Sequence, residues 1–501
     1  MDKPPIIHIA AVSIPAFSHQ ASLLEFSKRL LHLHPHFHVT CIFPTVGSPP
    51  DATISTLHSL PPSLHVTFLP PIPKHHLPQH SPPAVQIQLA VSLSVPSLRN
   101  ALETLRSTSS SSSPIVAVIA DPFANEALEI AKELDLLSFV YFPPSAMTLA
   151  LFLNLPRLDR EISCEYRDLK EPIHIIPGES SMVTINGPDL PEHLQDRSSL
   201  SYDLLLQRCK RFDLADGFLV NTFFEMEEAA ITALQRQRFS LFPIGPIAQS
   251  GSETGSGSGP GSGSGCVEWL EIQPPRSVLY VSFGSGGTLS EEQVNELALG
   301  LELSGQKFLW VVRAPSNESA NAAYLSNEKQ SNNNNNNNDI DSDNFKDSMQ
   351  FLPSGFLERI RSKRQGMIVS SWAPQARILS HNSTGGFLTH CGWNSSLESI
   401  VCGVPMIAWP LFAEQRMNAV LLTEGLKVGL RPKAEGINGV VRKEEIARVV
   451  RDLMEDGEEE GNGIRRRIEE LREGAGCAMR EGGSSTKALS QVVERIENFG
   501  S

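Results

Sequence analysis

The chain has 501 residues, of which 40% are hydrophobic and 20% charged, a composition typical of a globular protein long enough for two domains. Its formal net charge of −14 and the lack of a Lys/Arg cluster argue against a nucleic-acid-binding surface. The seven cysteines are scattered and form no C-x-x-C pair, which predicts free thiols rather than disulfides or a zinc site.

The N-terminal segment MDKPPIIHIAAVSIPAFSHQ has a short apolar run that is interrupted by His8 and Pro15. This pattern favours a first strand over a secretory signal. No segment approaches the roughly 20 apolar residues that a membrane span requires. We therefore expect a cytoplasmic protein that binds neither membranes nor nucleic acid.

Two low-complexity segments divide the sequence. Residues 249–265, QSGSETGSGSGPGSGSG, have the composition of a flexible linker. The second segment, about residues 316–348, holds seven consecutive asparagines and is too polar to be buried, so we expect a disordered surface insertion. The expected domains are therefore 1–248 and 266–483.

Short β-rich runs alternate with helical patterns along both halves. The first half begins with IIHIAAVSI at 6–14 and a helical pattern at 21–33, and its further predicted strands are 38–43, 65–70, 115–121 and 138–142. The predicted strands of the second half are 277–285, 307–312, 366–371, 385–390 and 404–410. Continuous apolar strands between helices indicate parallel sheets covered on both faces. We predict an α/β fold of two doubly wound, Rossmann-like domains facing each other across a cleft, with ligands at the carboxyl ends of the strands.

The segment THCGWNSSLESI connects a predicted strand to a predicted helix and collects many polar groups. Gly392 allows a sharp turn, and a helix that starts near Asn394 or Ser395 offers N–H groups and a dipole that favour an anion. His390, just before the turn, can donate to the same anion. Glu398 shares a helix face with Asn394, and its carboxylate can accept hydrogen bonds from a ribose diol.

The same residues also allow a purely structural interpretation. Ser395 and Glu398 have the spacing of a capping box, in which Glu398 reaches back to the start of the helix. A single histidine such as His390 is more often structural than functional, and Trp393 would usually belong to the core. The turn by itself leaves both interpretations open.

The longer segment from Trp372 to Gln415 decides between them. WAPQARILSHNSTGGFLTHCGWNSSLESIVCGVPMIAWPLFAEQ resembles, without gaps, the signature box of the plant UDP-dependent glycosyltransferases of secondary metabolism. The resemblance extends over the whole chain apart from the two low-complexity segments, and points to the hydroquinone-glucosyltransferase-like branch. It implies a GT-B fold and the inverting transfer of glucose from UDP-glucose to a hydroxyl of a phenol, monolignol or flavonoid, giving a β-O-glucoside.

The resemblance implies a role for each matching residue. Trp372 stacks on uracil while the backbone of Ala373 reads the edge of the base, and two residues hold the ribose hydroxyls, Gln375 and Glu398. The residues implied for the diphosphate are His390, Asn394, Ser395 and Ser285. Those implied for the sugar are Trp393, Glu414 and Gln415, the last of which favours glucose over galactose.

The resemblance also implies the catalytic pair. His19, between the first predicted strand and the first predicted helix, matches the base that takes the acceptor proton. Asp121 matches the aspartate that orients this histidine and stabilises its charged form. Taken alone, His19 is more often a histidine in a surface loop or at a helix start, and Asp121 is an ordinary helix N-cap. Ser18 stands where many members carry glycine, which puts the acceptor identity in doubt but not the reaction class.

No D-x-D motif or His/Asp cluster is apparent outside DIDSD at 339–343, in the asparagine-rich segment, so we expect neither metal nor cofactor. We expect a monomer whose C-terminal helix, about 484–501, packs back on the N-terminal domain. A non-catalytic UDP-sugar-binding protein is the alternative function, although the presence of both His19 and Asp121 argues against it. A nicotinamide-dependent oxidoreductase is disfavoured, because IPAFSH stands where G-x-G-x-x-G would be required.

Overall fold

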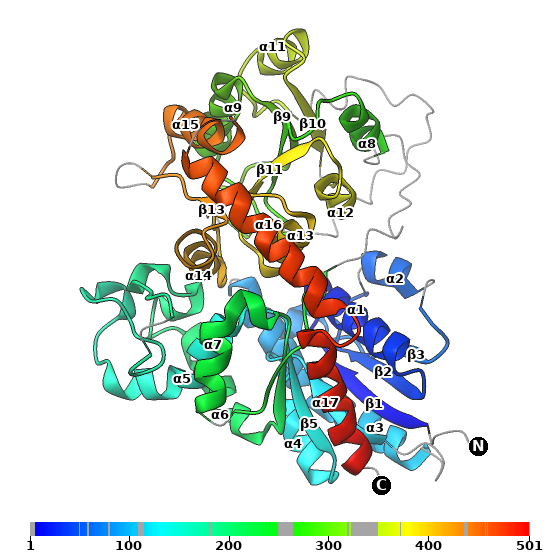
Figure 1. Ribbon diagram of the computed structural model, residues 1–501. Coiled ribbons are helices and arrows are strands. Elements are labelled where there is room, and N and C mark those ends of the chain that lie inside the picture. The colour runs from blue at the N-terminus through cyan, green and yellow to red at the C-terminus, as the bar shows by residue number, and fades with distance from the viewer. Residues whose placement is uncertain are drawn as a thin grey trace. The chain divides into compact units, whose positions relative to one another are not determined.

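The computed structural model divides the chain into two compact units, Met1–Gln249 with Gly474–Ser501, and Ser250–Glu473 (Figure 1). Most of the predicted linker and most of the predicted asparagine-rich insertion lie outside the residues that it describes. The described residues are 6–49, 51–57, 60–78, 81–108, 115–179, 182–237, 239–248, 264–317, 320–321, 349–370, 372–434, 439–455, 457 and 459–499.

The first unit is built on a parallel sheet of seven strands in the order β3-β2-β1-β4-β5-β6-β7. The strands are β1 (Ile7–Val12), β2 (Phe37–Phe43), β3 (Leu64–Phe68), β4 (Ile115–Ala120), β5 (Leu137–Phe142), β6 (Gly217–Val220) and β7 (Leu241–Pro243). Every residue of β4 and β5 is buried, as expected for apolar strands covered on both faces. Because β1 pairs with both β2 and β4, the winding of the sheet reverses between β1 and β4.

Helices cover both faces of this sheet (Figure 1). They are α1 (Phe17–Leu33), α2 (Asp51–Leu57), α3 (Pro83–Thr108), α4 (Glu126–Glu133), α5 (Ala146–Glu161), α6 (Leu200–Arg211), α7 (Phe224–Arg236) and α17 (Ser484–Phe499). The short 3-10 helices are η1 (Lys74–His76), η2 (Tyr166–Asp168), η3 (Gly187–Asp189), η4 (Glu192–Leu194) and η5 (Phe212–Leu214).

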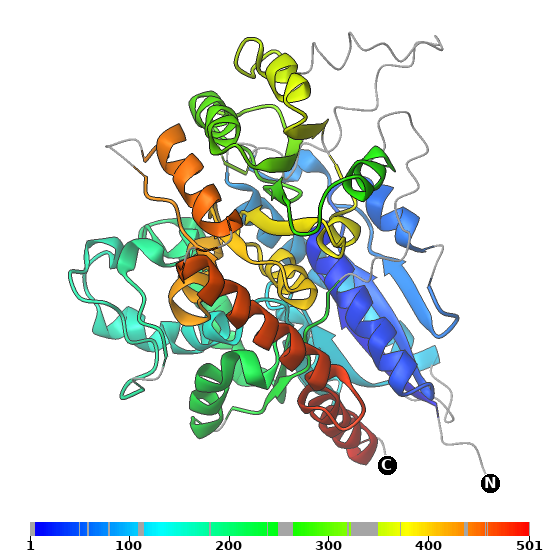
Figure 2. The same ribbon diagram turned by 45° about the horizontal axis from the view of Figure 1, so that its top comes forward.

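The C-terminal helix α17 belongs to the first unit and lies beside α1 (Figures 1 and 2). Its buried residues Leu489, Val492 and Ile496 share one apolar cluster with residues of α1 and of the sheet. Nη2 of Arg29 on α1 donates to Oγ1 of Thr486 on α17 at 3.1 Å. The end of the chain thus closes the core of the unit in which the chain begins.

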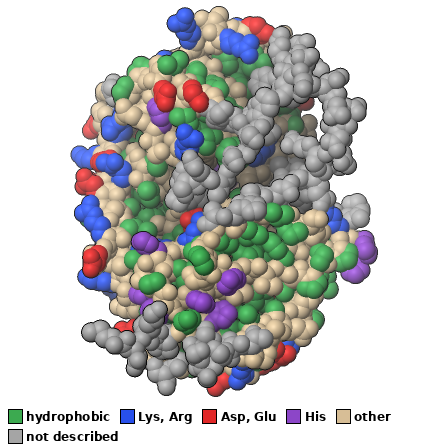
Figure 3. All heavy atoms as spheres, turned by 90° about the vertical axis from the view of Figure 1, so that its right-hand side faces the viewer, with side chains coloured by type: hydrophobic (Ala, Val, Ile, Leu, Met, Phe, Trp, Pro, Cys, Tyr) green, Lys and Arg blue, Asp and Glu red, His purple; other side chains and the backbone are tan. Residues whose placement is uncertain are grey.

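Three histidines, His8, His38 and His65, lie on the neighbouring strands β1, β2 and β3 of the first sheet. Figure 3 shows histidine side chains on one face of this unit. The strand register pairs His8 with His38, and Thr40 with His65. Nε2 of His8 lies 2.8 Å from Oγ1 of Thr40. Burial, followed by the proximity of the other two imidazoles, lowers the pKa of His8 to about 4.

The second unit repeats the architecture with a parallel sheet of six strands in the order β10-β9-β8-β11-β12-β13. The strands are β8 (Val278–Ser282), β9 (Lys307–Val312), β10 (Gly366–Ser370), β11 (Thr384–Thr389), β12 (Met406–Ala408) and β13 (Gly429–Leu430). Its helices are α8 (Ser264–Glu271), α9 (Glu291–Ser304), α11 (Phe356–Ser362), α12 (Gln375–Leu379), α13 (Trp393–Cys402), α14 (Gln415–Val420), the π-helix η6 (Leu421–Gly425) and α15 (Lys443–Met454). Here the winding reverses between β8 and β11. Helix α16 (Glu459–Met479) begins in this unit, and its residues from Gly474 on belong to the first unit.

The predicted fold class, two doubly wound Rossmann-like α/β units, is confirmed by these sheets. Three strands were not predicted, β6, β7 and β13, which have four, three and two residues. Strands this short carry little alternation of their own, and the three-residue β12 was predicted only because it lies in the longer apolar run 404–410. The helix predicted at 21–33 begins earlier, at Phe17, so that His19 lies in its first turn and not before it.

Candidate active site

The first group of predicted site residues lies where the winding of the first sheet reverses. His19 stands in the first turn of α1, which follows β1, and Asp121 directly follows β4. Nδ1 of His19 lies 2.6 Å from Oδ2 of Asp121. Because a carboxylate only accepts, Nδ1 carries the proton, and Nε2 is then the ring nitrogen with a lone pair. The His19 side chain is 19% exposed and that of Asp121 only 2%, so the imidazole is the accessible partner.

Asp121 is held in a defined orientation by its neighbours. Its main-chain N–H donates to the carbonyl of Val12 on β1 at 2.8 Å. Its Oδ1 accepts the N–H of Phe123 at 2.9 Å, while Oδ2 faces His19. The interpretation of Asp121 as a helix N-cap is wrong, because α4 begins at Glu126 and its N-cap is Asn125.

In the second unit, the imidazole of His390 is enclosed by two glycine turns at the carboxyl ends of β8 and β11. A Cβ atom on Gly284 would lie 2.5 Å from the His390 ring, and one on Gly392 would lie 2.4 Å from its Nε2. Cys391, between His390 and Gly392, has a φ of 65°, which is uncommon outside glycine. The imidazole can occupy this position only because Gly284 and Gly392 have no side chain.

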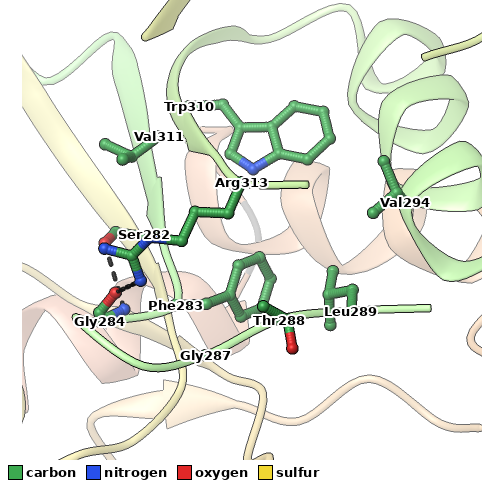
Figure 4. A pocket seen from close by; sticks show the side chains of 10 residues that line it. All are labelled: Ser282, Phe283, Gly284, Gly287, Thr288, Leu289, Val294, Trp310, Val311 and Arg313. Atoms are coloured by element: carbon green, nitrogen blue, oxygen red, sulfur yellow. Dashed lines mark hydrogen bonds between the residues drawn. The ribbon is translucent and has the colours of Figure 1, made fainter. Parts of the chain in front are cut away.

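Arg313, at the end of β9, lies beside this histidine. One of its guanidinium N–H groups donates to the carbonyl of Gly284, as Figure 4 shows. Burial and, second, the charge of Arg313 lower the pKa of His390 to about 4. His390 is therefore neutral near pH 7 and can donate one hydrogen bond without carrying a charge.

Two polar atoms of this turn are buried without a hydrogen-bond partner among the described residues, Nδ1 of His390 and Oδ1 of Asn394. Such atoms are rare in native proteins and occur where a water, ion or ligand completes the bonding. A nucleotide with its phosphate oxygens and hydroxyls would supply partners of the required kind.

Helix α13 begins at Trp393, slightly earlier than predicted, and its N-cap is Gly392, which has no side chain to cap it. The first hydrogen bond of the helix runs from Ser396 N to Gly392 O at 3.0 Å. The N–H groups of Asn394 and Ser395 therefore precede the helical bonding pattern and favour an anion.

The carboxylate of Glu398 is engaged by a side chain from a different helix. Nε2 of Gln375, at the start of α12, donates to Oε2 of Glu398 at 2.7 Å and to Oγ of Ser395 at 2.9 Å. The capping-box interpretation is wrong, because Ser395 lies inside the helix and is not its N-cap. Nearby in sequence, Trp372 is 52% exposed, whereas Ala373 is 6% exposed.

The other predicted residues lie at the carboxyl ends of β8, β11 and β12. Ser285 is exposed in the turn after β8, and Trp393 is only 3% exposed, so most of its ring packs in the interior. Glu414 is the N-cap of α14. Oε1 of Gln415 accepts the N–H groups of Leu411 and Phe412 at 2.9 and 3.0 Å, which turns its amide nitrogen away from that loop.

Comparison with known proteins identifies what such a site serves. The model of the family "UDP-glucoronosyl and UDP-glucosyl transferase" matches residues 255–430. Hydroquinone glucosyltransferase of Rauvolfia serpentina is 45% identical over 494 residues, covering 98% of each chain. The chain belongs to the plant UDP-glycosyltransferase family.

Solved structures agree with this assignment. Phytolacca americana UGT2, complexed with UDP-2fluoro-glucose and pterostilbene, is 42% identical, covers 98% of this chain and 99% of its own, and superposes with a TM-score of 0.84. A UDP-glucosyltransferase from Polygonum tinctorium capable of glucosylating indoxyl, complexed with 3,4-dichloroaniline, is 40% identical over 99% of both chains, with a TM-score of 0.84.

The chain is thus a UDP-glucosyltransferase of small acceptors, with the GT-B fold of its family, and the predicted family and enzyme class are confirmed. Among the described residues, no helix combines the length and apolar character needed to cross a membrane. In that same part of the chain, no three His, Cys, Asp or Glu side chains are grouped as a metal site.

Two residues that contact the candidate site were missed by the sequence analysis. Arg313 is the first residue after the apolar run KFLWVV, so the rule that ligands bind after strands could have found it. Asn418 is fully buried, and its Nδ2 donates to the carbonyl of Cys391 at 2.9 Å and to Glu414 at 3.4 Å. It thereby connects the turn after β11 to the start of α14, and no local pattern indicated this contact.

Proposed function

We propose that this UDP-glycosyltransferase moves glucose from UDP-glucose to a hydroxyl of a small phenol with inversion, giving a β-O-glucoside. The observation that carries the proposal is the 2.6 Å contact between His19 Nδ1 and Asp121 Oδ2, with the imidazole accessible and the carboxylate buried. This arrangement suits a general base whose tautomer is fixed from behind.

In the proposed reaction the acceptor hydroxyl gives its proton to Nε2 of His19. The oxygen forms a bond to the anomeric carbon, while the bond from that carbon to the diphosphate breaks and its electron pair leaves with UDP. Asp121 keeps its negative charge and stabilises the imidazolium that forms. Because attack and departure occur on opposite faces of the sugar, a single displacement converts the α-linked donor into a β-glucoside.

The second unit is proposed to hold the donor. The exposed Trp372 offers a ring face for uracil and the backbone of Ala373 reads the edge of the base. Gln375 and Glu398, which a hydrogen bond joins, are proposed to hold the ribose diol. The start of α13 is proposed to receive the diphosphate. The residues assigned to this diphosphate site are His390, Asn394, Ser395 and Ser285, and those assigned to the sugar are Trp393, Glu414 and Gln415.

The neutral state of His390 fits this role. A neutral imidazole N–H can stabilise the departing diphosphate by a hydrogen bond, and the helix dipole adds to the effect. Both groups are in place before the reaction, so they need no reorganisation as charge develops on the leaving oxygen.

Aromatic hydroxyl compounds are the proposed acceptor class. The names of the relatives support this choice, since they mention hydroquinone, pterostilbene and indoxyl. The ring of Phe123 stands at 6.0 Å from that of His19, which provides an aromatic neighbour for a phenol bound at the base.

The test is a screen of the full chain against a panel of phenols with UDP-glucose, UDP-galactose and UDP-xylose, with products detected by mass spectrometry. We expect glucosides of some phenols, and a β configuration from the proton coupling at the anomeric carbon. An α-anomer would overturn the inverting mechanism. UDP binding without any product across the panel would favour a sugar-nucleotide-binding protein instead.

A further inference from the structure

A buried arginine outside the site described above is connected to the catalytic pair. The side chain of Arg208, on α6, is 2% exposed. Its Nη1 donates to the carbonyl of Phe123 at 2.7 Å and to Oε2 of Glu126 at 2.8 Å, and its Nε donates to Oε1 of Gln88 at 3.1 Å. Arginine is rarely buried to this degree unless each donor group has an assigned partner.

The residue that Arg208 grips is the one that orients Asp121. The carbonyl of Phe123 accepts from Arg208, its N–H donates to Oδ1 of Asp121, and its ring contacts that of His19 edge-on. A second bond joins the same elements, because Nδ2 of Asn125 donates to the carbonyl of Arg208 at 2.8 Å. Both the side chain and the main-chain carbonyl of Arg208 thus bind helix α6 to the segment between β4 and the start of α4.

We infer that Arg208 is a positioning residue for the base: it fixes the turn at Phe123 and thereby the carboxylate that aligns His19. This inference rests on the proposed role of His19. The bond to Oδ1 defines the plane of the carboxylate and so the direction of Oδ2. Small displacements of a catalytic group can lower turnover strongly, because proton transfer requires close alignment with the acceptor.

The competing explanation is that Arg208 only stabilises the fold through its ion pair with Glu126. Removing Arg208 alone would leave a buried carboxylate unpaired and could prevent folding. The double substitution R208M/E126Q removes both charges and keeps similar volumes, so it is the primary test variant. R208K, which can still donate to the Phe123 carbonyl, is the conservative variant.

Arg197 offers a matched control in the same unit. Its side chain is 16% exposed, pairs with Asp159 at 2.9 Å and lies over the ring of Tyr166. It also donates to the carbonyl of Cys164 at 2.8 Å. Within the described residues, Arg197 makes its contacts to residues 159–166 and to Tyr202, away from Phe123 and Asp121, so R197M tests the loss of a comparable arginine without disturbing the base.

The readout compares two phenols of similar size. One stays protonated at the assay pH, and the other is a nitrophenol that is already ionised and needs no base. With the protonated phenol, we expect R208M/E126Q to lower kcat about tenfold or more. With the ionised phenol the loss should be small, the KM for UDP-glucose should stay unchanged, and R208K should recover part of the activity. R197M should affect both acceptors alike.

His19→Ala, measured in parallel, distinguishes the proposed base function of His19 from the positioning role of Arg208. If H19A retains normal turnover of the protonated phenol, the proposed function of His19 is wrong. If H19A behaves as a base-deficient variant while R208M/E126Q loses activity equally with both phenols, or loses none, the positioning role of Arg208 alone is overturned. Unfolding midpoints and UDP affinity, measured for every variant, show whether the protein is folded.

Discussion

Nδ1 of His19 and Oδ2 of Asp121 lie 2.6 Å apart although 102 positions separate the residues in the sequence. They meet because β1 and β4 are neighbouring parallel strands, whose carboxyl ends lie at the same edge of the sheet. The carboxyl ends of adjacent parallel strands, where the winding reverses, are the one place where such distant residues are brought together by topology alone.

Asp121→Asn should therefore impair the base without removing it. The amide can present an N–H to Nδ1, which favours the tautomer with its proton on Nε2, where the acceptor proton must go. We expect kcat to fall by about 10²- to 10⁴-fold with an unchanged dissociation constant for UDP. Steady-state kinetics and calorimetric titration with UDP check both values.

Asp216→Asn is the matched control for this substitution. Asp216 also orders main chain in the first unit, since its Oδ2 accepts the N–H of Ser138 at 2.8 Å, but it pairs with Lys132. D216N should retain turnover with modestly lower stability. Equal losses of activity in D121N and D216N would mean that Asp121 acts only through the fold.

Gly392→Ala should weaken UDP binding through His390. The added methyl group would lie 2.4 Å from Nε2, so the imidazole must leave its position between the two glycine turns. We expect about a tenfold weaker affinity for UDP, the effect of losing one hydrogen bond to a charged group, and about 1 kcal/mol lower stability, because alanine is a poor N-cap.

The control is Gly476→Ala in α16, where the new methyl group meets no atom within 4 Å. It should leave UDP affinity unchanged and raise stability slightly, as alanine favours helix. In a His390→Ala background, G392A should add little further loss of affinity. Fully additive losses would show that the glycine acts independently of the histidine.

Most candidates of the nucleotide half came from the match between residues 372–415 and the signature box of the family. The strand-turn-helix pattern by itself pointed only to the residues from His390 to Glu398, because an anion site is expected where a helix starts after a strand. The start of α1 was harder to predict, since its N-cap is Ala16, which makes no side-chain capping bond. The sequence therefore has no capping residue that marks the start of this helix. For this reason the helix was predicted to begin too late, and His19 was predicted to precede it.

The supporting contacts could not be predicted, because they join residues that only tertiary packing brings together. Arg208 and Phe123 are 85 positions apart, and Asn418 and Cys391 are 27 apart. Each pair consists of a side chain and a main-chain carbonyl, and carbonyls carry no sequence signature. Arg313 could have been predicted, since it directly follows strand β9, just as His390 directly follows β11.

Glu398→Ala should remove a contact to the ribose while leaving the rest of the donor site in place. A hydrogen bond to a charged group contributes about 1.5–3 kcal/mol, so UDP affinity should fall about 10- to 100-fold. The chemical assignment is checked with 2′-deoxy and 3′-deoxy analogues of UDP. Wild type should discriminate against at least one analogue, and E398A should have lost that discrimination.

Glu302→Ala is the control for this experiment. Glu302 is a partly buried carboxylate of the same unit that pairs with Arg359 and Lys363, each at 2.9 Å. The E302A variant should bind UDP and the deoxy analogues with the affinities of the wild type. If E398A still discriminates against the analogues as wild type does, Glu398 does not bind the ribose.

The stability of the first unit should fall on acidification, and His8 contributes to this beside His34 and His193, whose pKa values are also lowered, chiefly by burial. An unfolded histidine takes up a proton near pH 6.5, whereas the folded pKa of His8 is lowered to about 4 by burial and by His38 and His65. Between these values the unfolded state binds more protons, so stability is full above pH 6.5 and is lost as the pH falls toward 4. The denaturant midpoint of the first unit, followed from pH 7.5 to 5, measures this loss.

His8→Gln should make that pH dependence less steep by the share that His8 contributes. The glutamine amide can keep a hydrogen bond to Thr40, which lies 2.8 Å from Nε2 of His8, but it cannot be protonated. The pKa of His390 is also about 4, so its protonation lowers the stability of the second unit on acidification in the same way. H8Q should therefore leave the pH dependence of the second unit unchanged. His32→Gln, at an exposed position of α1, is the control and should keep the wild-type slope. An unchanged slope in H8Q would show that His8 is not the group whose protonation drives acid unfolding of the first unit.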